Sequence, residues 1–198
     1  MSTLSYIGIL GGIFSLAGYL PYAKAVIKGD AKPERSSWLI WTLSSILILM
    51  SYYFVGARET IWVPLAYVIG SGTITALSFR YGQEGWGLLE KVSLAVAIVS
   101  GIRWIFFNNV GLALVLNLSL SFVSYLRTIK KLVFDKTAQE DVPGWSSYFI
   151  GAALNIAAIP VWSLEISALP IMFFVMNSVT LLLTLRNRKY APQENPAP

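Results

Sequence analysis

The two halves of the chain resemble each other, with similar residues in the same order roughly a hundred positions apart. Tyr22 corresponds to Tyr125, an offset of about 103 residues. Further on, Arg80 corresponds to Arg186 at an offset of about 106, so small differences in loop length explain the drift. An internal repeat constrains the whole fold and has to be recognised first. Each copy holds three hydrophobic segments, and that number decides the architecture.

The hydrophobic segments have the length of membrane spans. The chain has 198 residues, of which 56% are hydrophobic and 13% are charged, whereas about 25% are charged in a typical soluble domain. A helix needs about 20 apolar residues to cross a bilayer. Seven stretches meet this length, at residues 4–27, 38–56, 61–80, 87–107, 110–132, 145–163 and 166–185. The predicted fold class is therefore an all-α integral membrane protein with seven transmembrane helices.

The basic residues predict the orientation of these spans, because Lys and Arg collect on the cytoplasmic side of a membrane. With the N-terminus outside, thirteen of the fifteen basic residues fall in cytoplasmic segments, and Arg58 and Arg103 fall outside. The charges are scattered over four segments, which favours contact with anionic lipid headgroups over a nucleic-acid partner. We expect a multi-pass protein whose C-terminus is cytoplasmic.

An odd number of spans explains how two three-helix copies can run in the same direction. Three helices end on the side opposite to their start, so one extra span is needed before a parallel copy can begin. The sequence predicts a first three-helix repeat at 4–82, a linker helix at 87–107, a second repeat at 110–189 and a disordered tail at 190–198. Transporters with parallel repeats bind solute near the midplane, between the two halves.

The step Leu20-Pro21-Tyr22 lies near the cytoplasmic end of the first span. Together with the three-one-three layout and the external N-terminus, it resembles the SWEET sugar facilitators and, more broadly, the PQ-loop superfamily, whose signature is a Pro-Gln step at this place. The resemblance covers residues 4–189, and Ser124 is the second-repeat counterpart of Pro21. It implies a seven-helix transporter for a sugar, with gating or hinge positions at Pro21 and Ser124.

Uncharged polar residues within the spans are the candidate substrate site. Asn177 lies midway along the seventh span, and Ser71 lies at the corresponding depth of the third. Asparagines at these two depths line the sugar site of SWEET proteins, so the resemblance implies substrate binding by Asn177 and Ser71. An amide offers two donors and an acceptor, which suits an array of hydroxyl groups. The alternative is that Asn177 makes a packing hydrogen bond to another helix.

Two further residues are candidates for the same site. Asn155 lies in the middle of the sixth span, and its counterpart in the second span is near Ile48, so the pair is asymmetric. Trp162 precedes Asn177 by a spacing similar to that of a SWEET tryptophan that stacks on the sugar. For Asn155 the alternative is helix packing. For Trp162 the alternative is an anchor at the membrane interface.

Composition argues against catalysis and against coupled transport. The chain contains no His and no Cys, and its Asp and Glu residues fall in predicted loops, the tail or helix ends. Acid–base catalysis and metal binding therefore lack their usual groups, and we expect no enzyme activity, no cofactor and no metal. A proton pump needs an ionisable group inside the membrane, so passive transport is favoured.

The leading hypothesis is facilitated diffusion of a small neutral polar solute, such as a sugar, by alternating access. One alternative is a non-transporting receptor or sorting protein on the same scaffold. Another is a nucleoside or vitamin carrier, in which stacking aromatic residues would line the midplane. The expected partners are the lipid bilayer and a small-molecule solute, and assembly into a homo-oligomer stays open.

Overall fold

The computed structural model describes residues 2–84, 87–107, 110–138 and 140–190. Within this part of the chain the regular structure is helical, apart from one isolated bridge between Glu34 and Gln83. The elements are α1 (Thr3–Ala17), α2 (Leu20–Lys28), α3 (Arg35–Phe54), α4 (Trp62–Tyr81), α5 (Leu88–Phe107), α6 (Val110–Phe134), α7 (Val142–Ala157), α8 (Leu164–Asn187) and the 3-10 helix η1 (Arg188–Tyr190). Residues 191–198 of the predicted tail lie outside the described part.

The helices follow the hydropathy of the sequence. They occupy the seven ranges predicted as spans, and α1 and α2 together fill the first range. By length and composition, four helical stretches of the described residues could cross a membrane: Thr3–Lys28, Arg35–Phe54, Trp62–Tyr81 and Leu164–Tyr190. The all-α fold is confirmed, and the apolar helices are compatible with a multi-pass membrane protein. The count of seven crossings stays a prediction.

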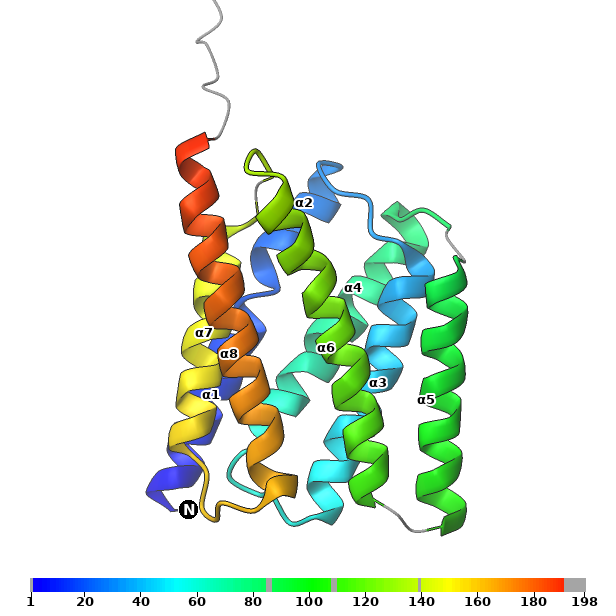
Figure 1. Cartoon of the computed structure of the whole chain (residues 1–198), viewed down its shortest axis with the longest axis vertical. Coiled ribbons are helices and arrows are strands. Elements are labelled where there is room, and N and C mark those ends of the chain that lie inside the picture. Colours follow the sequence, from blue (N-terminus) through cyan, green and yellow to red (C-terminus); the bar gives the residue numbers. More distant parts are fainter. Residues whose placement is uncertain (1, 85–86, 108–109, 139, 191–198) are drawn as a thin grey trace, which may run out of the picture.

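Contacts between neighbouring helices arrange six of them in a closed ring, which we call the helix ring. Contacts join α1 to α4, α4 to α3, α3 to α6, α6 to α8, α8 to α7, and α7 back to α1. Helix α5 lies outside this ring, against α3 and α6. The start of α1 is at one end of the bundle and the end of α8 is at the other (Figure 1). The interior of the helix ring is therefore the place where residues from both halves of the chain meet.

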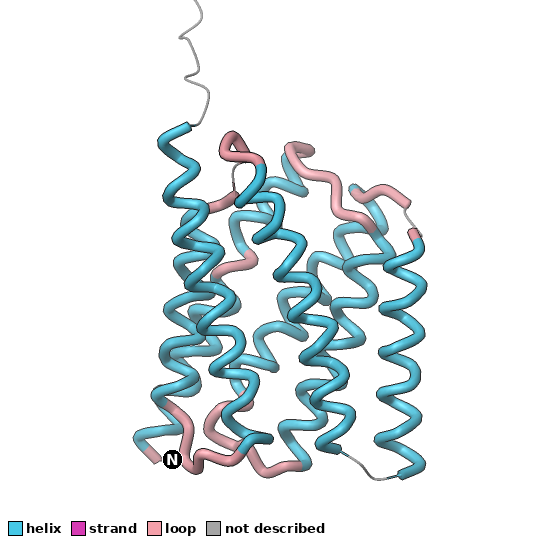
Figure 2. Tube along the Cα trace, in the orientation of Figure 1, coloured by secondary structure: helices cyan, strands magenta, loops and turns pink. Residues whose placement is uncertain are grey.

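The first predicted span is interrupted between α1 and α2, and Figure 2 shows this interruption as a loop within the bundle. Pro21 stands in the first turn of α2. A proline has no N–H, and its ring collides with the carbonyl group four residues earlier, so a helix is kinked or broken at this point. The chain passes this point with a tighter turn, in which the Tyr19 N–H donates to the Leu16 carbonyl at 3.1 Å. A hinge at Pro21 stays a prediction.

Helices α1 and α7 approach each other so closely that their backbones touch. A Cβ atom placed on Gly151 of α7 would lie 2.8 Å from the carbonyl oxygen of Gly11 and 2.9 Å from the backbone nitrogen of Ser15. At Gly18, a Cβ atom would lie 2.6 Å from the ring of Tyr148. Small residues allow such close packing in membranes, where dispersion contacts drive helix association. The side of the helix ring formed by α1 and α7 is therefore tightly closed.

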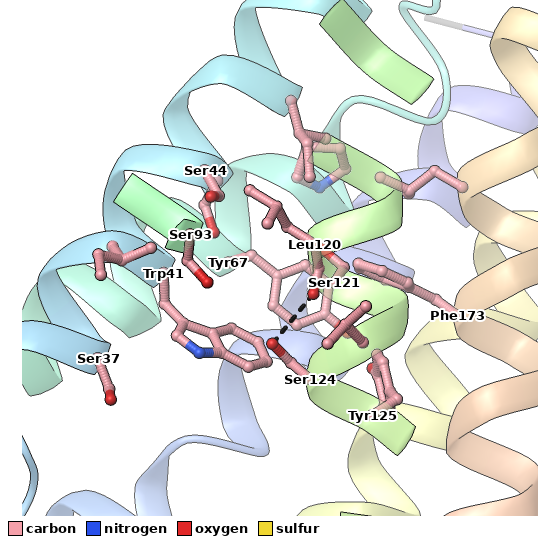
Figure 3. A pocket seen from close by; sticks show the side chains of 16 residues that line it. Ser37, Trp41, Ser44, Tyr67, Ser93, Leu120, Ser121, Ser124, Tyr125 and Phe173 are labelled. Atoms are coloured by element: carbon pink, nitrogen blue, oxygen red, sulfur yellow. Dashed lines mark hydrogen bonds between the residues drawn. The ribbon is translucent and has the colours of Figure 1, made fainter. Parts of the chain in front are cut away.

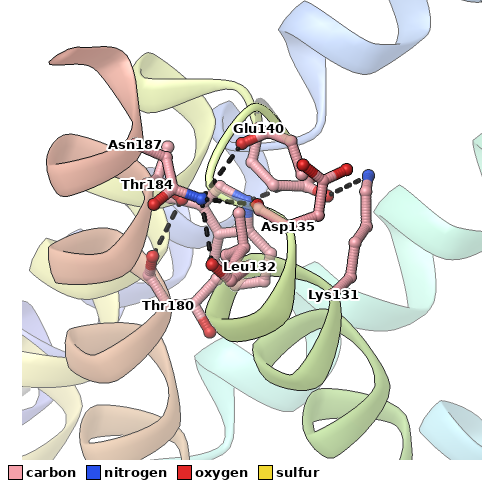
Figure 4. Close-up of polar contacts among 9 residues, drawn as sticks. Lys131, Leu132, Asp135, Glu140, Thr180, Thr184 and Asn187 are labelled. Atoms are coloured by element: carbon pink, nitrogen blue, oxygen red, sulfur yellow. Dashed lines mark hydrogen bonds and ion pairs between the residues drawn. The ribbon is translucent and has the colours of Figure 1, made fainter. Parts of the chain in front are cut away.

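The C-terminal ends of α6 and α8 are tied together by Asn187 (Figure 4). Its Nδ2 donates to the carbonyl oxygens of Leu132, Asp135 and Ala138, at 3.0, 3.1 and 3.3 Å. Nη2 of Arg186 also donates to the Leu132 carbonyl, at 2.7 Å. The last carbonyl groups of a helix have no partners within that helix. The two side chains of α8 therefore complete the hydrogen bonding at the end of α6.

Replacing Asn187 with alanine is expected to lower the free energy of unfolding by about 2–4 kcal/mol, because buried carbonyl groups lose their donor. The midpoint of thermal unfolding in detergent is the measurement. Arg188→Ala changes the exposed neighbouring residue and is the control, with an expected change within about 0.5 kcal/mol. Equal shifts for the two variants would contradict the structural role of Asn187.

Candidate functional site

A cavity of about 60 Å³ lies between α3 and α6 of the helix ring (Figure 3). Its lining residues come from α3, α4, α5, α6 and α8. The lining includes no Asp, Glu, Lys or Arg among the described residues. The two halves of the chain meet at two contacts, which we call seams: α1 with α7, and α3 with α6. The α1–α7 seam is tightly packed, whereas the α3–α6 seam contains the cavity.

Serine hydroxyl groups form the polar part of the cavity wall. Helix α3 contributes Ser37, Ser44 and Ser45, and α6 contributes Ser121 and Ser124. The hydroxyls of Ser121 and Ser124 donate to backbone carbonyls four residues earlier, at 3.2 and 3.1 Å, which leaves their oxygen atoms as acceptors. The hydroxyls of Ser44 and Ser45 form no hydrogen bond with any described residue. These two groups are free to donate to a bound molecule.

Aromatic side chains form the apolar part of the wall. Tyr67 of α4 and Phe173 of α8 meet edge to face, with ring centroids 5.0 Å apart and an interplanar angle of 86°. Tyr125 of α6 lies next to Phe173, at 5.9 Å between centroids, and Trp41 of α3 lines the opposite part of the wall. A mainly apolar wall with a few oriented polar groups is the usual composition of a small-molecule site.

A cluster of buried and half-buried aromatic rings connects the cavity wall with the α1–α7 contact. Tyr148 of α7 stacks on Tyr67, with centroids 6.0 Å apart and an interplanar angle of 24°. Its edge contacts involve Tyr19 at 5.3 Å and Trp145 at 5.8 Å. Aromatic pairs in such geometries stabilise a fold beyond the area that they bury. Tyr67 belongs to both the cluster and the cavity wall, so the cavity lies at one side of the cluster.

Asn177 lies behind the cavity wall. It is fully buried in α8, where its Oδ1 accepts a hydrogen bond from the Tyr125 hydroxyl at 2.7 Å. Its Nδ2 donates to the carbonyl oxygen of Tyr148 at 3.2 Å. Because Tyr125 itself lines the cavity, Asn177 is one side chain away from it and orients the tyrosine ring. Direct contact between Asn177 and a solute stays a prediction.

Ser71 and Asn155 are also buried, and neither belongs to the cavity wall. The Ser71 hydroxyl donates to the carbonyl oxygen of Tyr67 within α4, at 2.6 Å. Asn155 lies in α7, and its Oδ1 has no hydrogen-bond partner within the described part of the chain. The structure thus places both residues inside the protein but outside the wall of the cavity. Their binding roles stay predictions.

The remaining candidates are divided between the cavity and the surface. Trp162 lies in the connection between α7 and α8, where 67% of its surface is exposed. The structure does not bring it to the cavity, and its position suits an anchor at the membrane interface. Of the two predicted gating positions, Ser124 lines the cavity and Pro21 does not.

Sequence reasoning did not assign Ser44, Ser45, Tyr67 or Ser121 to the site, and it predicted Ser124 only as a gating position. Ser121 and Ser124 are three residues apart and therefore lie on one face of a helix, and that spacing is a signal for a shared polar surface. Ser44 and Ser45 are adjacent hydroxyls in the middle of a predicted span. Tyr67 carries no comparable signal, because aromatic residues make up 14% of this chain and occur in most spans.

The chemistry available in the cavity is hydrogen bonding and stacking. Among the described residues, acidic side chains form no cluster of three or more that could hold a metal ion. The wall offers hydroxyl donors, hydroxyl acceptors and aromatic faces to a neutral molecule. Comparisons of the chain with protein-family models, with curated proteins and with solved structures found no match.

Proposed function

We propose that this protein is a membrane transporter that moves a small neutral polar solute, with a sugar as the first candidate, by facilitated diffusion. The observation that carries the proposal is the cavity between α3 and α6, whose wall combines serine hydroxyls with aromatic rings and has no charged side chain among the described residues. Hydroxyl groups can donate and accept, which suits a solute rich in hydroxyls. A coupled pump would need an ionisable group in the pathway, so the proposed transport is passive.

The proposed architecture is three plus one plus three, with α1 to α4 as one bundle, α5 as the linker and α6 to α8 as the other. Two contact patterns support it. Helix α4 packs against both α1 and α3, and α8 packs against both α6 and α7. Two contacts join the bundles, α1 with α7 and α3 with α6. In the proposed repeat α1 corresponds to α6 and α3 corresponds to α7, so each of these contacts is the counterpart of the other. Such a pattern suits parallel repeats related by an axis along the membrane normal.

The size of the cavity favours alternating access. By the same measure of volume, one water molecule needs about 10–15 Å³, so a cavity of about 60 Å³ has room for a few water molecules. A monosaccharide is larger than this. Its binding therefore requires the α3–α6 side to widen, and its passage requires the bundles to rock from one open state to the other. We propose that the N-terminus lies outside and the C-terminus lies in the cytoplasm, because this orientation puts most of the basic residues on the cytoplasmic side.

Uptake into proteoliposomes tests this function, with a panel of labelled sugars, nucleosides and amino acids. We expect the wild type to take up at least one neutral hydroxylated solute. Replacing Ser44 and Ser45 together with alanine removes two free donors and is expected to raise the half-saturation concentration about tenfold. Ser119→Ala is the matched control, because Ser119 is an exposed serine of α6 whose hydroxyl donates to the carbonyl four residues earlier.

The same experiment separates the alternatives. A wild type that moves none of the panel would contradict transport and favour a non-transporting receptor on this scaffold. Uptake restricted to nucleosides would favour a nucleoside or vitamin carrier that uses the aromatic wall for stacking. Equal effects of the double variant and the Ser119 control would show that the cavity serines do not contact the solute.

A further inference from the structure

Helix α5 lies outside the helix ring and yet contributes to the cavity. Ser93 belongs to the cavity wall, and Figure 3 shows its hydroxyl directed into the space between Ser44 and Trp41. The helix reaches this position because it packs against both α3 and α6, which carry the other serines of the wall. A helix that only reversed the direction of the chain would need no polar group here.

The depth and direction of Ser93 strengthen this point. It is the sixth residue of α5. At a rise of about 1.5 Å per residue, it lies about 7–8 Å along the helix axis from the first residue of α5. Neighbouring Val92 is 48% exposed and belongs to the outward-facing surface of α5. Because successive residues of a helix point about 100° apart, the apolar side chain faces outward while the hydroxyl faces the cavity.

We propose that α5 forms one wall of the binding site and that Ser93 is a solute-binding residue. The class of ligand, a neutral molecule with several hydroxyl groups, rests on the proposed function. Serines of α3, α5 and α6 face the cavity from three sides. A ligand that contacts all three walls must carry hydroxyls on different parts of its surface, as a polyol or a sugar ring does. A solute with a single hydrogen-bonding group would use only one wall.

Cysteine labelling tests the position of Ser93 without reference to transport. The chain contains no cysteine, so each single-cysteine variant reports on one residue. The variants are Ser93→Cys, Ser44→Cys as the cavity reference and Val92→Cys as the outward-facing control. They are treated in proteoliposomes with a small water-soluble methanethiosulfonate reagent, and labelling is followed by mass spectrometry. We expect Ser93→Cys to react about as fast as Ser44→Cys and about tenfold or more faster than Val92→Cys, since labelling requires access and a thiolate.

Uptake of the solute panel tests whether Ser93 also binds. Ser93→Ala is expected to raise the half-saturation concentration of the transported solute about threefold to tenfold, the effect of one hydrogen bond. Val92→Ala is the control and should leave the half-saturation concentration unchanged. An unaltered half-saturation concentration in Ser93→Ala would overturn the binding role.

The outcomes of labelling distinguish this inference from the proposed function. If Ser93→Cys reacts as slowly as Val92→Cys while Ser44→Cys reacts fast, α5 is not a wall of the cavity. If all three react slowly, the cavity is closed to water-soluble molecules, and both proposals fail. If Ser93→Cys reacts fast and the wild type moves no solute, transport is rejected while α5 remains part of a binding site.

Discussion

Replacing Gly151 with alanine is expected to lower the free energy of unfolding by about 1–3 kcal/mol or more, the range found for overpacked interiors. The new methyl group would press on the backbone of α1 at Gly11 and Ser15, and backbone atoms cannot turn aside as a flexible side chain can. Helices α1 and α7 would have to separate along their length. The expected result is a large fall in the thermal midpoint and in the yield of monodisperse protein.

Gly72→Ala is the matched control, since it adds the same methyl group to a glycine in the interior of a helix. The nearest atom to a Cβ at Gly72 is Cγ2 of Thr42, at 3.9 Å, which is ordinary contact. Alanine is the better helix former by about 0.5–1 kcal/mol, so this variant should be neutral or slightly stabilised. Similar midpoints for the two variants would show that α1 and α7 are not in backbone contact.

Replacing Asn177 with alanine is expected to reduce uptake about tenfold or more, although Asn177 does not line the cavity. The substitution leaves the Tyr125 hydroxyl without the acceptor that it contacts at 2.7 Å, and it removes the side-chain donor at 3.2 Å from the Tyr148 carbonyl. A buried group left without a partner, as the Tyr125 hydroxyl would be, costs about 1–3 kcal/mol. The Tyr125 ring should therefore be less well oriented, and the free energy of unfolding should fall.

Tyr125→Phe separates positioning from direct contact. It removes the same hydrogen bond but keeps the amide of Asn177 and the aromatic ring in the wall. If Asn177 acts through Tyr125, the two variants should lose uptake to a similar degree, while Asn177→Ala loses more thermal stability. Normal uptake by Tyr125→Phe together with no uptake by Asn177→Ala would instead show that the amide contacts the solute itself.

The positions of the helices could be predicted because a chain in lipid must satisfy its backbone hydrogen bonds within each segment. The predicted linker at 87–107 corresponds to α5, at Leu88–Phe107. The largest difference is at α7, which ends at Ala157 whereas hydropathy extended the span to 163. The residues between are apolar but include Pro160, and a proline inside a helix removes a backbone hydrogen bond and kinks or ends the helix.

The start of α7 shows a signal that hydropathy does not contain. The helix begins at Val142, before the predicted start at 145, because Asp141 caps it. Its Oδ2 accepts a hydrogen bond from the Gly144 N–H at 2.6 Å. Capping by Asp with proline in the first turn is a known start pattern for helices, so this boundary could have been predicted from local chemistry.

The site was harder to predict than the helices because the sequence does not show which way each helix turns its polar residues. In lipid, the outer face of a helix is as apolar as the face that packs inside, so hydropathy gives little guidance. Asn177 and Ser71 were selected by depth, and both are buried near Tyr67 and its neighbours. The cavity lies instead beside Ser44 and Ser45, whose exposure to it depends on how α3 packs against α6.

The contrast between the two seams has a mechanical consequence. Backbones in contact at Gly11 and Gly151 can rotate against each other, but they cannot part without losing all of their dispersion contacts at once. The α3–α6 seam already contains free volume and loses less when it widens. We therefore expect the two halves to move by rotation about the α1–α7 contact, which acts as the hinge, so that the largest displacement occurs on the side of α3, α6 and α5. Probes placed across α1 and α7 should report a nearly constant distance, while probes across α3 and α6 should report the full swing.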